Sequence, residues 1–249
     1  MSSNSYASFW DHLDELRSRI IKMLLAVVAM SVIAFLLKEP LFRIVLAPSG
    51  GGFVTYRILS VPDFSIHLIN TGLTEQFMVH MRTSLYMGLL VASPYIIYEL
   101  FCFVAPGLYV HERRYAMWLV VSSYVMFILG TLLNYFLVFP LTVRFLGTYQ
   151  VSPNVTNMLT LQSYIDTLIS MSFLMGVLFE LPVVCWLMGR MGIINSRMMS
   201  TYRRHAIVAI LVLAAIVTPT TDVFSLFVVA LPIWMLYELS ALIVKTSNL

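Results

Sequence analysis

The sequence predicts an all-α polytopic membrane protein, with six transmembrane helices in a single integral membrane domain over residues 1–249. Apolar residues make up 60% of the chain and charged residues only 11%, whereas soluble domains carry roughly 25% charged residues. The apolar runs are also long enough to be spans, because a helix needs about 20 residues to cross a hydrocarbon core of ~30 Å. Cys102 and Cys185 both lie within such runs, which is typical of buried thiols rather than of a disulfide.

An amphipathic helix is expected just before the first span, which we place at 20–38. Its apolar stripe recurs at helical spacing and consists of Phe9, Leu13, Leu16 and Ile20. A stripe of this kind favours a helix that lies on the inner membrane surface, with its acids toward water. In the first span itself, Lys22 and Lys38 can extend toward the two interfaces.

The remaining spans are expected at 72–101, 114–139, 162–188, 204–218 and 222–243. Proline lacks the N–H that bonds one turn back, so Pro94 and Pro182 should kink the second and fourth spans. The last two spans are predicted to be short. Between Ala206 and Thr218 the fifth covers only about 20 Å. We therefore expect a hairpin of two short helices, which thins the membrane or sits against other protein.

The distribution of basic residues predicts that both termini are cytoplasmic. Lysine and arginine are enriched on the cytoplasmic side of spans, and this orientation places ten of them inside and five outside. The inside set is Arg17, Arg19, Lys22, Arg113, Arg114, Arg190, Arg197, Arg203, Arg204 and Lys245. The outside set is Lys38, Arg43, Arg57, Arg82 and Arg144.

Glu180 is the only charged residue between Thr167 and Gly189. A charge at that depth costs ~2.5–3.5 kcal/mol on insertion scales. Such residues generally face other protein or a wet cavity, which favours a contact with a partner or a substrate. The structural alternative is a protonated acid that is hydrogen-bonded to a neighbouring helix.

No catalytic apparatus is visible, so the chain is not expected to be an enzyme. The sequence has no GxxxxGK(S/T) phosphate loop, no HExxH zinc pair and no GxSxG elbow. The five histidines are scattered without ligand spacing. We therefore expect no catalytic residue, no metal or other cofactor, and no nucleic-acid partner.

Two further acids, Glu15 and Glu112, are predicted to lie at the inner face, and Phe103 comes nine residues before Glu112. Carboxylates and an aromatic ring suit a ligand with guanidinium groups, since arginine pairs with carboxylates and stacks on aromatic rings. The structural alternatives are local ion pairs. Glu15 can pair with Arg19 one turn on, worth ~0.3–0.5 kcal/mol, and Glu112 can pair with its basic neighbours or cap the third span.

Several segments, in order along the chain, resemble the TatC family, the multi-spanning receptor of the twin-arginine protein translocase. The segment 12–19 reads HLDELRSR and resembles the family's HLxELRxR opening. Residues 103–114, FVAPGLYVHERR, resemble its F-x-x-P-(A/G)-L-Y-x-x-E-(R/K) loop, and residues 176–182, GVLFELP, resemble its G-x-x-F-E-x-P segment. Thr-Pro at 218–219 with DVFS at 222–225 resembles its final outer turn, and Ala-Pro at 47–48 resembles a shorter signature after the first span.

The resemblance implies a receptor and core subunit that binds the twin-arginine signal peptides of folded cargo. Export across the bacterial inner membrane would draw on the proton gradient. The resemblance assigns peptide binding to Phe103 and Glu112, supported by Glu15, and assigns contact with single-span TatA- and TatB-type subunits to Glu180. It also implies a multi-pass protein of the lipid bilayer that associates with itself in a larger complex. The residues left as structural or uncertain are Arg17, Pro48, Glu99 and Asp222.

The chain departs from the family pattern at Phe101, where many members have tryptophan, and at Glu99, where glutamine is common. Glu99 adds a third acid near the inner face, which either widens the site for a basic ligand or extends toward the interface. Two other function classes stay open. A secondary solute or ion transporter would use Glu180 as a proton relay. An intramembrane enzyme would pair Asp222 with Glu180, which we expect to be too far apart to share a proton.

Overall fold

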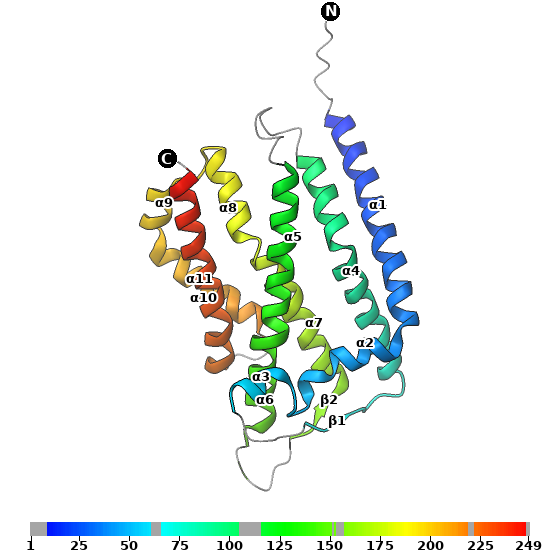
Figure 1. The fold of residues 1–249 in the computed structure, drawn as a ribbon. Coiled ribbons are helices and arrows are strands. Elements are labelled where there is room, and N and C mark those ends of the chain that lie inside the picture. The colour runs from blue at the N-terminus through cyan, green and yellow to red at the C-terminus, as the bar shows by residue number, and fades with distance from the viewer. Residues whose placement is uncertain are drawn as a thin grey trace, which may run out of the picture. The chain divides into compact units, whose positions relative to one another are not determined.

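The computed structural model describes residues 9–60, 66–104, 116–150, 152, 157–218 and 222–247. Helices dominate this part of the chain, and its only strands are two short ones (Figure 1). The predicted all-α class is therefore confirmed. The chain divides into two units, one of Met1–Leu41 with His80–Tyr124 and the other of Phe42–Val79 with Val125–Leu249.

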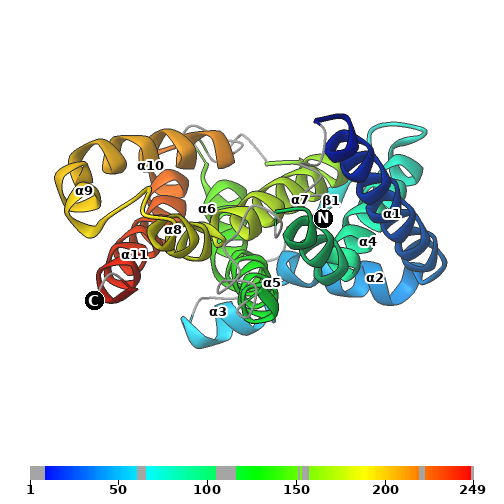
Figure 2. The ribbon, with the colours of Figure 1, turned by 90° about the horizontal axis from the view of Figure 1, so that it is seen from above.

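The first unit is built on α1 (Phe9–Leu36) and on most of α4 (Glu75–Val104), which run side by side in both ribbon views (Figures 1 and 2). The two helices approach closely at Gly88, where a side chain would collide with Ser31. Nearby, the rings of Phe35 and His80 stack with centroids 4.1 Å apart. The absence of a side chain at Gly88 thus allows the close contact between the helices.

α1 is one continuous helix of 28 residues, so the expectation of a separate amphipathic helix before the first span is wrong. Neither glycine nor proline occurs between Phe9 and Leu36, and nothing else in this segment interrupts the backbone hydrogen bonds. Residues 9–20 therefore form the first turns of the helix that continues into the span.

α4 continues through Pro94 as a single helix of 30 residues. Because Pro94 has no N–H, the carbonyl of Leu90 loses its usual donor. The hydroxyl of Ser93 donates to that carbonyl at 2.7 Å instead. A serine beside the proline therefore satisfies the backbone group that the proline leaves, as is common where prolines occur in membrane helices. The kink expected at Pro94 stays a prediction.

The second unit packs helices with one pair of strands. In chain order its elements are the end of α2 (Lys38–Val45), η1 (Ala47–Ser49), α3 (Val54–Ile58), β1 (Leu68–Ile69), the first turn of α4, the end of α5 (Ala116–Leu133), η4 (Asn134–Val138), α6 (Phe139–Thr148), β2 (Leu159–Thr160), α7 (Leu161–Leu178), α8 (Leu181–Arg190), α9 (Ser196–Thr201), α10 (Arg203–Val217) and α11 (Val223–Ser247). The strands pair in parallel, with Leu68 opposite Leu159 and Ile69 opposite Thr160. α11 packs against α8 and α10.

Small residues bring α5 and α7 together in the core of this unit. A side chain on Gly176 would collide with the ring of Phe127, and Gly130 faces α7 in the same way. Close approach through glycine is typical of helix packing in membranes. Next to this contact the side-chain amide of Asn134 donates to the hydroxyl of Ser172 at 2.8 Å, and both residues are buried.

The third expected span was predicted to end at residue 139, and this boundary is wrong. α5 leads through the π-helical turn η4 into α6, so that helical structure continues to Thr148. Pro140 does not end the helix, because it lies in the first turn of α6 directly after the π turn, and a side chain of α3 bonds the carbonyl that its missing N–H leaves without a donor.

The short helix α3 supplies hydrogen bonds to this irregular part of the chain. The Thr55 hydroxyl donates to the carbonyl of Phe136, which lies four residues before Pro140 and therefore lacks its usual donor. The buried Tyr56 hydroxyl lies 3.0 Å from the carbonyl oxygens of both Pro48 and Pro140. α3 thus satisfies backbone groups that the prolines and the π turn leave open.

Glu75 joins the start of α4 to the start of α7. Its Oε2 accepts from the backbone N–H groups of Thr71 at 2.8 Å and Gly72 at 2.9 Å. Its Oε1 accepts from the backbone N–H of Gln162 at 3.0 Å. The carboxylate is buried and accepts hydrogen bonds at the N-terminal ends of both helices, where negative charge is favoured.

Five stretches of the described residues are long and apolar enough to cross a membrane: Leu13–Leu36, Glu75–Phe103, Met117–Thr148, Leu161–Arg190 and Val223–Thr246. α10, at the place of the fifth expected span, has only 15 residues and is not among them, so the number of six stays a prediction. The expectation that both final helices are short is wrong for the last one. α11 has 25 residues and continues through Pro232, because the apolar sequence extends well beyond that proline.

Candidate functional site

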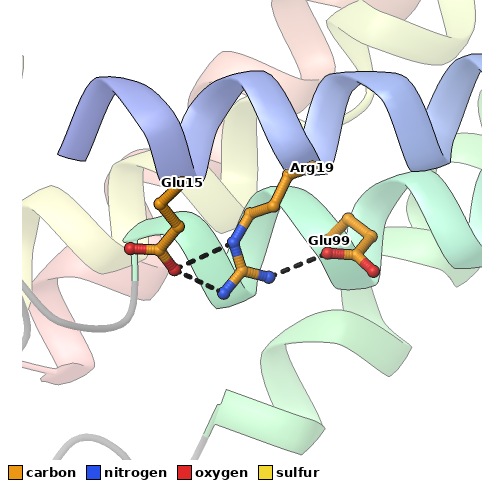
Figure 3. Close-up of polar contacts among 3 residues, drawn as sticks. All are labelled: Glu15, Arg19 and Glu99. Atoms are coloured by element: carbon orange, nitrogen blue, oxygen red, sulfur yellow. Dashed lines mark hydrogen bonds and ion pairs between the residues drawn. The ribbon is translucent and has the colours of Figure 1, made fainter. Parts of the chain in front are cut away.

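The first unit brings two acids together on one arginine. Glu15 and Arg19 lie four residues apart on α1 and therefore on the same helix face. Nε of Arg19 donates to Oε1 of Glu15 at 3.0 Å, and one terminal nitrogen of the guanidinium donates to the same oxygen at 2.6 Å. The other terminal nitrogen donates to Oε2 of Glu99 on α4 at 2.8 Å. Arg19 thus joins the two helices (Figure 3).

The two acids differ in their exposure to solvent. The Glu99 side chain is 7% exposed and the Glu15 side chain is 38% exposed, with Arg19 between them at 21%. The Glu99 carboxylate is therefore the buried partner of Arg19, whereas Glu15 is the more exposed one.

Phe103 lies one turn beyond Glu99 on α4 and so on the same face of that helix. Its side chain is half-buried. Glu112, the other acid predicted to bind a cationic ligand, lies outside the described residues. The structure therefore places Glu15, Glu99 and Phe103 in the same unit.

The structural alternative for Glu15, an ion pair with Arg19 one turn on, is confirmed as a contact. The prediction for Glu99 was incomplete, because Glu99 binds the same arginine from a second helix. The residues are 80 positions apart in sequence, so helical periodicity could not show this contact. The departure from the family pattern at Glu99 was the available signal.

Glu180 lies between α7 and α8, where its backbone forms the N-cap of α8. α7 ends at Leu178 and α8 begins at Leu181, so the helix is divided just before Pro182, and the kink expected there stays a prediction. Glu180 is half-buried. A carboxylate at a helix N-terminus is stabilised by the helix dipole, and this position lowers the cost of placing an acid within an apolar stretch.

Pro48 and Asp222 have structural contacts. Pro48 is buried in η1, and its carbonyl accepts from the Tyr56 hydroxyl. Asp222 precedes α11, and its Oδ2 accepts from the backbone N–H of Ser225 at 2.7 Å. This is the geometry of a helix N-cap. Arg17, in contrast, is exposed on α1.

One polar pair was missed by the sequence analysis. Arg203, at the start of α10, donates to Oε2 of Glu238 on α11 at 2.7 Å. Close by, the Tyr237 hydroxyl donates to the carbonyl of Met199 in α9 at 2.7 Å. The signal was Glu238 itself, an acid in an otherwise apolar span.

The sequence model of the family described as "Sec-independent protein translocase protein (TatC)" matches residues 11–232. The chain belongs to the TatC family. A relative named "Sec-independent protein translocase protein TatC" from Deinococcus radiodurans is 35% identical over 237 residues, covering 95% of this chain and 85% of the relative. The relative of the same name from Aquifex aeolicus is 33% identical over 239 residues, covering 96% of this chain and 95% of the relative.

Solved TatC structures share the fold. A crystal structure described as that of the twin arginine translocase receptor TatC has a TM-score of 0.79 and 32% identity to this chain. It covers 96% of this chain and 100% of the other. The TatC resemblance of the motifs and the polytopic helical fold are therefore confirmed.

Proposed function

We propose that this chain is the receptor subunit of a twin-arginine translocase and that it binds twin-arginine signal peptides at the ends of α1 and α4 that carry Glu15 and Phe103. Its relatives are named as TatC translocase proteins, and its structural neighbours as the twin arginine receptor. The observation that carries the proposal is the guanidinium of Arg19 between Glu15 and Glu99, at 2.6 and 2.8 Å. A site that already binds one guanidinium has the charge and the geometry to bind another from a peptide.

In this proposal the exposed carboxylate of Glu15 and the ring of Phe103 receive the peptide, together with Glu112 from the adjoining segment. A hydrogen bond to a charged group contributes ~1.5–3 kcal/mol, so two such bonds are enough to dominate selectivity. Arginine is preferred over lysine because its planar guanidinium can form two hydrogen bonds to one carboxylate and can stack on aromatic rings.

The receptor function also implies a location, partner subunits and a transport activity. The chain would sit in the bacterial inner membrane with both termini in the cytoplasm, as the lysine and arginine distribution favours. Glu180 would contact the transmembrane helices of single-span TatA- and TatB-type subunits, since a polar group in lipid gains from a hydrogen-bonding partner. Folded cargo would be exported on the proton gradient by a complex with several copies of the receptor. Transport, rather than catalysis, is the expected activity.

Site-specific photocrosslinking tests this function. A photoreactive phenylalanine analogue at Phe103, in full-length protein in membrane vesicles, should label a peptide with paired arginines and leave a paired-lysine version unlabelled. The same analogue at Phe227, an exposed residue of α11, serves as the control for non-specific insertion into the membrane. Equal labelling of the two peptides at position 103, or equal labelling at 103 and 227, would contradict the proposal.

A further inference from the structure

The Arg19 contact has two unequal halves. On the Glu15 side, both donors of the guanidinium share a single carboxylate oxygen, at 2.6 and 3.0 Å. This is not the two-oxygen fork in which arginine binds a carboxylate most strongly. Glu15 is also the more exposed of the two acids, and exposed pairs four residues apart on a helix are weak.

On the Glu99 side, the contact is buried. The Glu99 side chain is only 7% exposed, and a buried carboxylate that loses its cation is strongly destabilising. Arg19 therefore leaves Glu15 more easily than it leaves Glu99.

The charges of these three residues do not cancel. Glu15 and Glu99 carry two negative charges and Arg19 carries one positive charge. Of the two carboxylates, that of Glu15 is the more exposed, so a ligand can reach the cluster on this side.

We propose that Arg19 is an internal competitor for the peptide site and that Glu99 is the residue that holds it there. When a guanidinium from a signal peptide reaches Glu15, the Arg19 guanidinium gives up Glu15 and stays on Glu99. The exchange breaks the two Arg19 bonds to Glu15 and forms bonds of the same kind to the peptide. This inference rests on the proposed receptor function and adds a selectivity device to it.

Arg19 raises the affinity for Glu15 that a peptide needs in order to bind. Arg19 is on the same helix as Glu15, so its effective concentration at that carboxylate is high. A ligand that displaces it has to bind Glu15 at least as well as a guanidinium does. An ammonium group offers a point charge without the planar fork, so Arg19 favours paired arginines over paired lysines.

The test is a set of variants of the full-length protein in detergent or nanodiscs, with dissociation constants for paired-arginine and paired-lysine peptides. In Glu99→Gln, Arg19 has only Glu15 left to bind, and affinity for the arginine peptide should fall about tenfold. In the double variant Arg19→Gln with Glu99→Gln, the competitor is gone. Affinity for the arginine peptide should rise to at least that of the wild type, and the preference for arginine over lysine should decrease.

Three results overturn the inference. A double variant as weak as Glu99→Gln would mean that Glu99 binds the peptide directly. An unchanged affinity in Glu99→Gln would mean that Glu99 does not position Arg19. An unchanged arginine preference in the double variant would mean that Arg19 does not set selectivity. A wild type that binds both peptides equally would instead refute the receptor function itself.

Two further variants distinguish an effect on peptide binding from a general loss of folding. Arg19→Lys keeps the charge but binds two carboxylates less well than arginine does, so it should release Glu15 and tighten peptide binding. Weaker binding in this variant would count against the exchange. The matched control is Arg203→Gln with Glu238→Gln, which removes a comparable 2.7 Å ion pair between α10 and α11 and should leave the affinity for both peptides unchanged.

Discussion

The hydroxyl of Ser93 donates a 2.7 Å hydrogen bond to the carbonyl of Leu90. That carbonyl would accept from the backbone N–H of residue 94 in a regular helix, but residue 94 is proline. Ser93 is buried, so no water replaces the bond if the hydroxyl is removed.

We therefore expect Ser93→Ala to lower the free energy of unfolding by about 1 kcal/mol, measured by denaturant titration in mixed micelles. Ser240→Ala in α11 is the matched control. Ser240 is also buried and donates to a carbonyl of the preceding turn, that of Leu236 at 2.6 Å, but no proline follows it. An equal loss of unfolding free energy in the two variants would show that the serine bond next to Pro94 contributes no more than an ordinary serine bond within a helix.

Gly176→Ala should destabilise the packing of α5 on α7. The added methyl would lie 2.7 Å from the ring of Phe127, and overpacking of this kind typically costs ~1–3 kcal/mol. Gly50→Ala provides the comparison, because its methyl would lie 3.9 Å from its nearest neighbour, the carbonyl of Ala47. The same unfolding titration distinguishes them, and a Gly176 variant as stable as the Gly50 variant would contradict the close contact.

Tyr56→Phe should cost about 1 kcal/mol, since it removes the hydroxyl that lies between the carbonyls of Pro48 and Pro140. Burial raises the pKa of Tyr56 above its ordinary value of 10.0. The contribution of the neutral hydroxyl is therefore fully present below pH ~10 and is lost as the pH rises above that value. The difference in stability between wild type and variant should shrink in the alkaline range. A difference that stays constant there would argue against burial of the phenol.

Glu180→Ala should reduce co-purification of single-span subunits by about three- to tenfold, the range expected for one polar contact between membrane helices. Glu180→Gln keeps the capacity for hydrogen bonding and should retain part of the assembly. Peptide labelling at Phe103 is expected to be unaffected in both variants. Unchanged assembly in Glu180→Ala would return this residue to a purely structural role at the start of α8.

Hydropathy located most of the long helices, because spans have a length fixed by the bilayer. It failed at the ends of elements. The third span was expected to end at residue 139, although the π turn and the hydroxyl of Thr55 allow helical structure to continue past Pro140. The separate helix expected before the first span was wrong for the opposite reason, since the stripe at residues 9–20 contains no residue that would end a helix there.

Within the candidate site, the motifs located Glu15 and Phe103, and periodicity located Arg19 as a neighbour of Glu15. The contact between Arg19 and Glu99 could not be predicted in this way. It depends on the packing of α1 on α4, which the missing side chain of Gly88 allows. Pairings of this kind follow from the tertiary structure rather than from any local pattern.

Glu75 imposes a constraint on how this family member can vary. Its two oxygens accept from the amides of Thr71 and Gly72, in the connection before α4, and of Gln162, in the first turn of α7. Inserting one residue between Gly72 and Glu75 would lengthen the connection before α4 and disturb the spacing that places the amides of Thr71 and Gly72 on Oε2. Natural diversity in this connection should accordingly take the form of substitutions, whereas insertions and deletions should be rare.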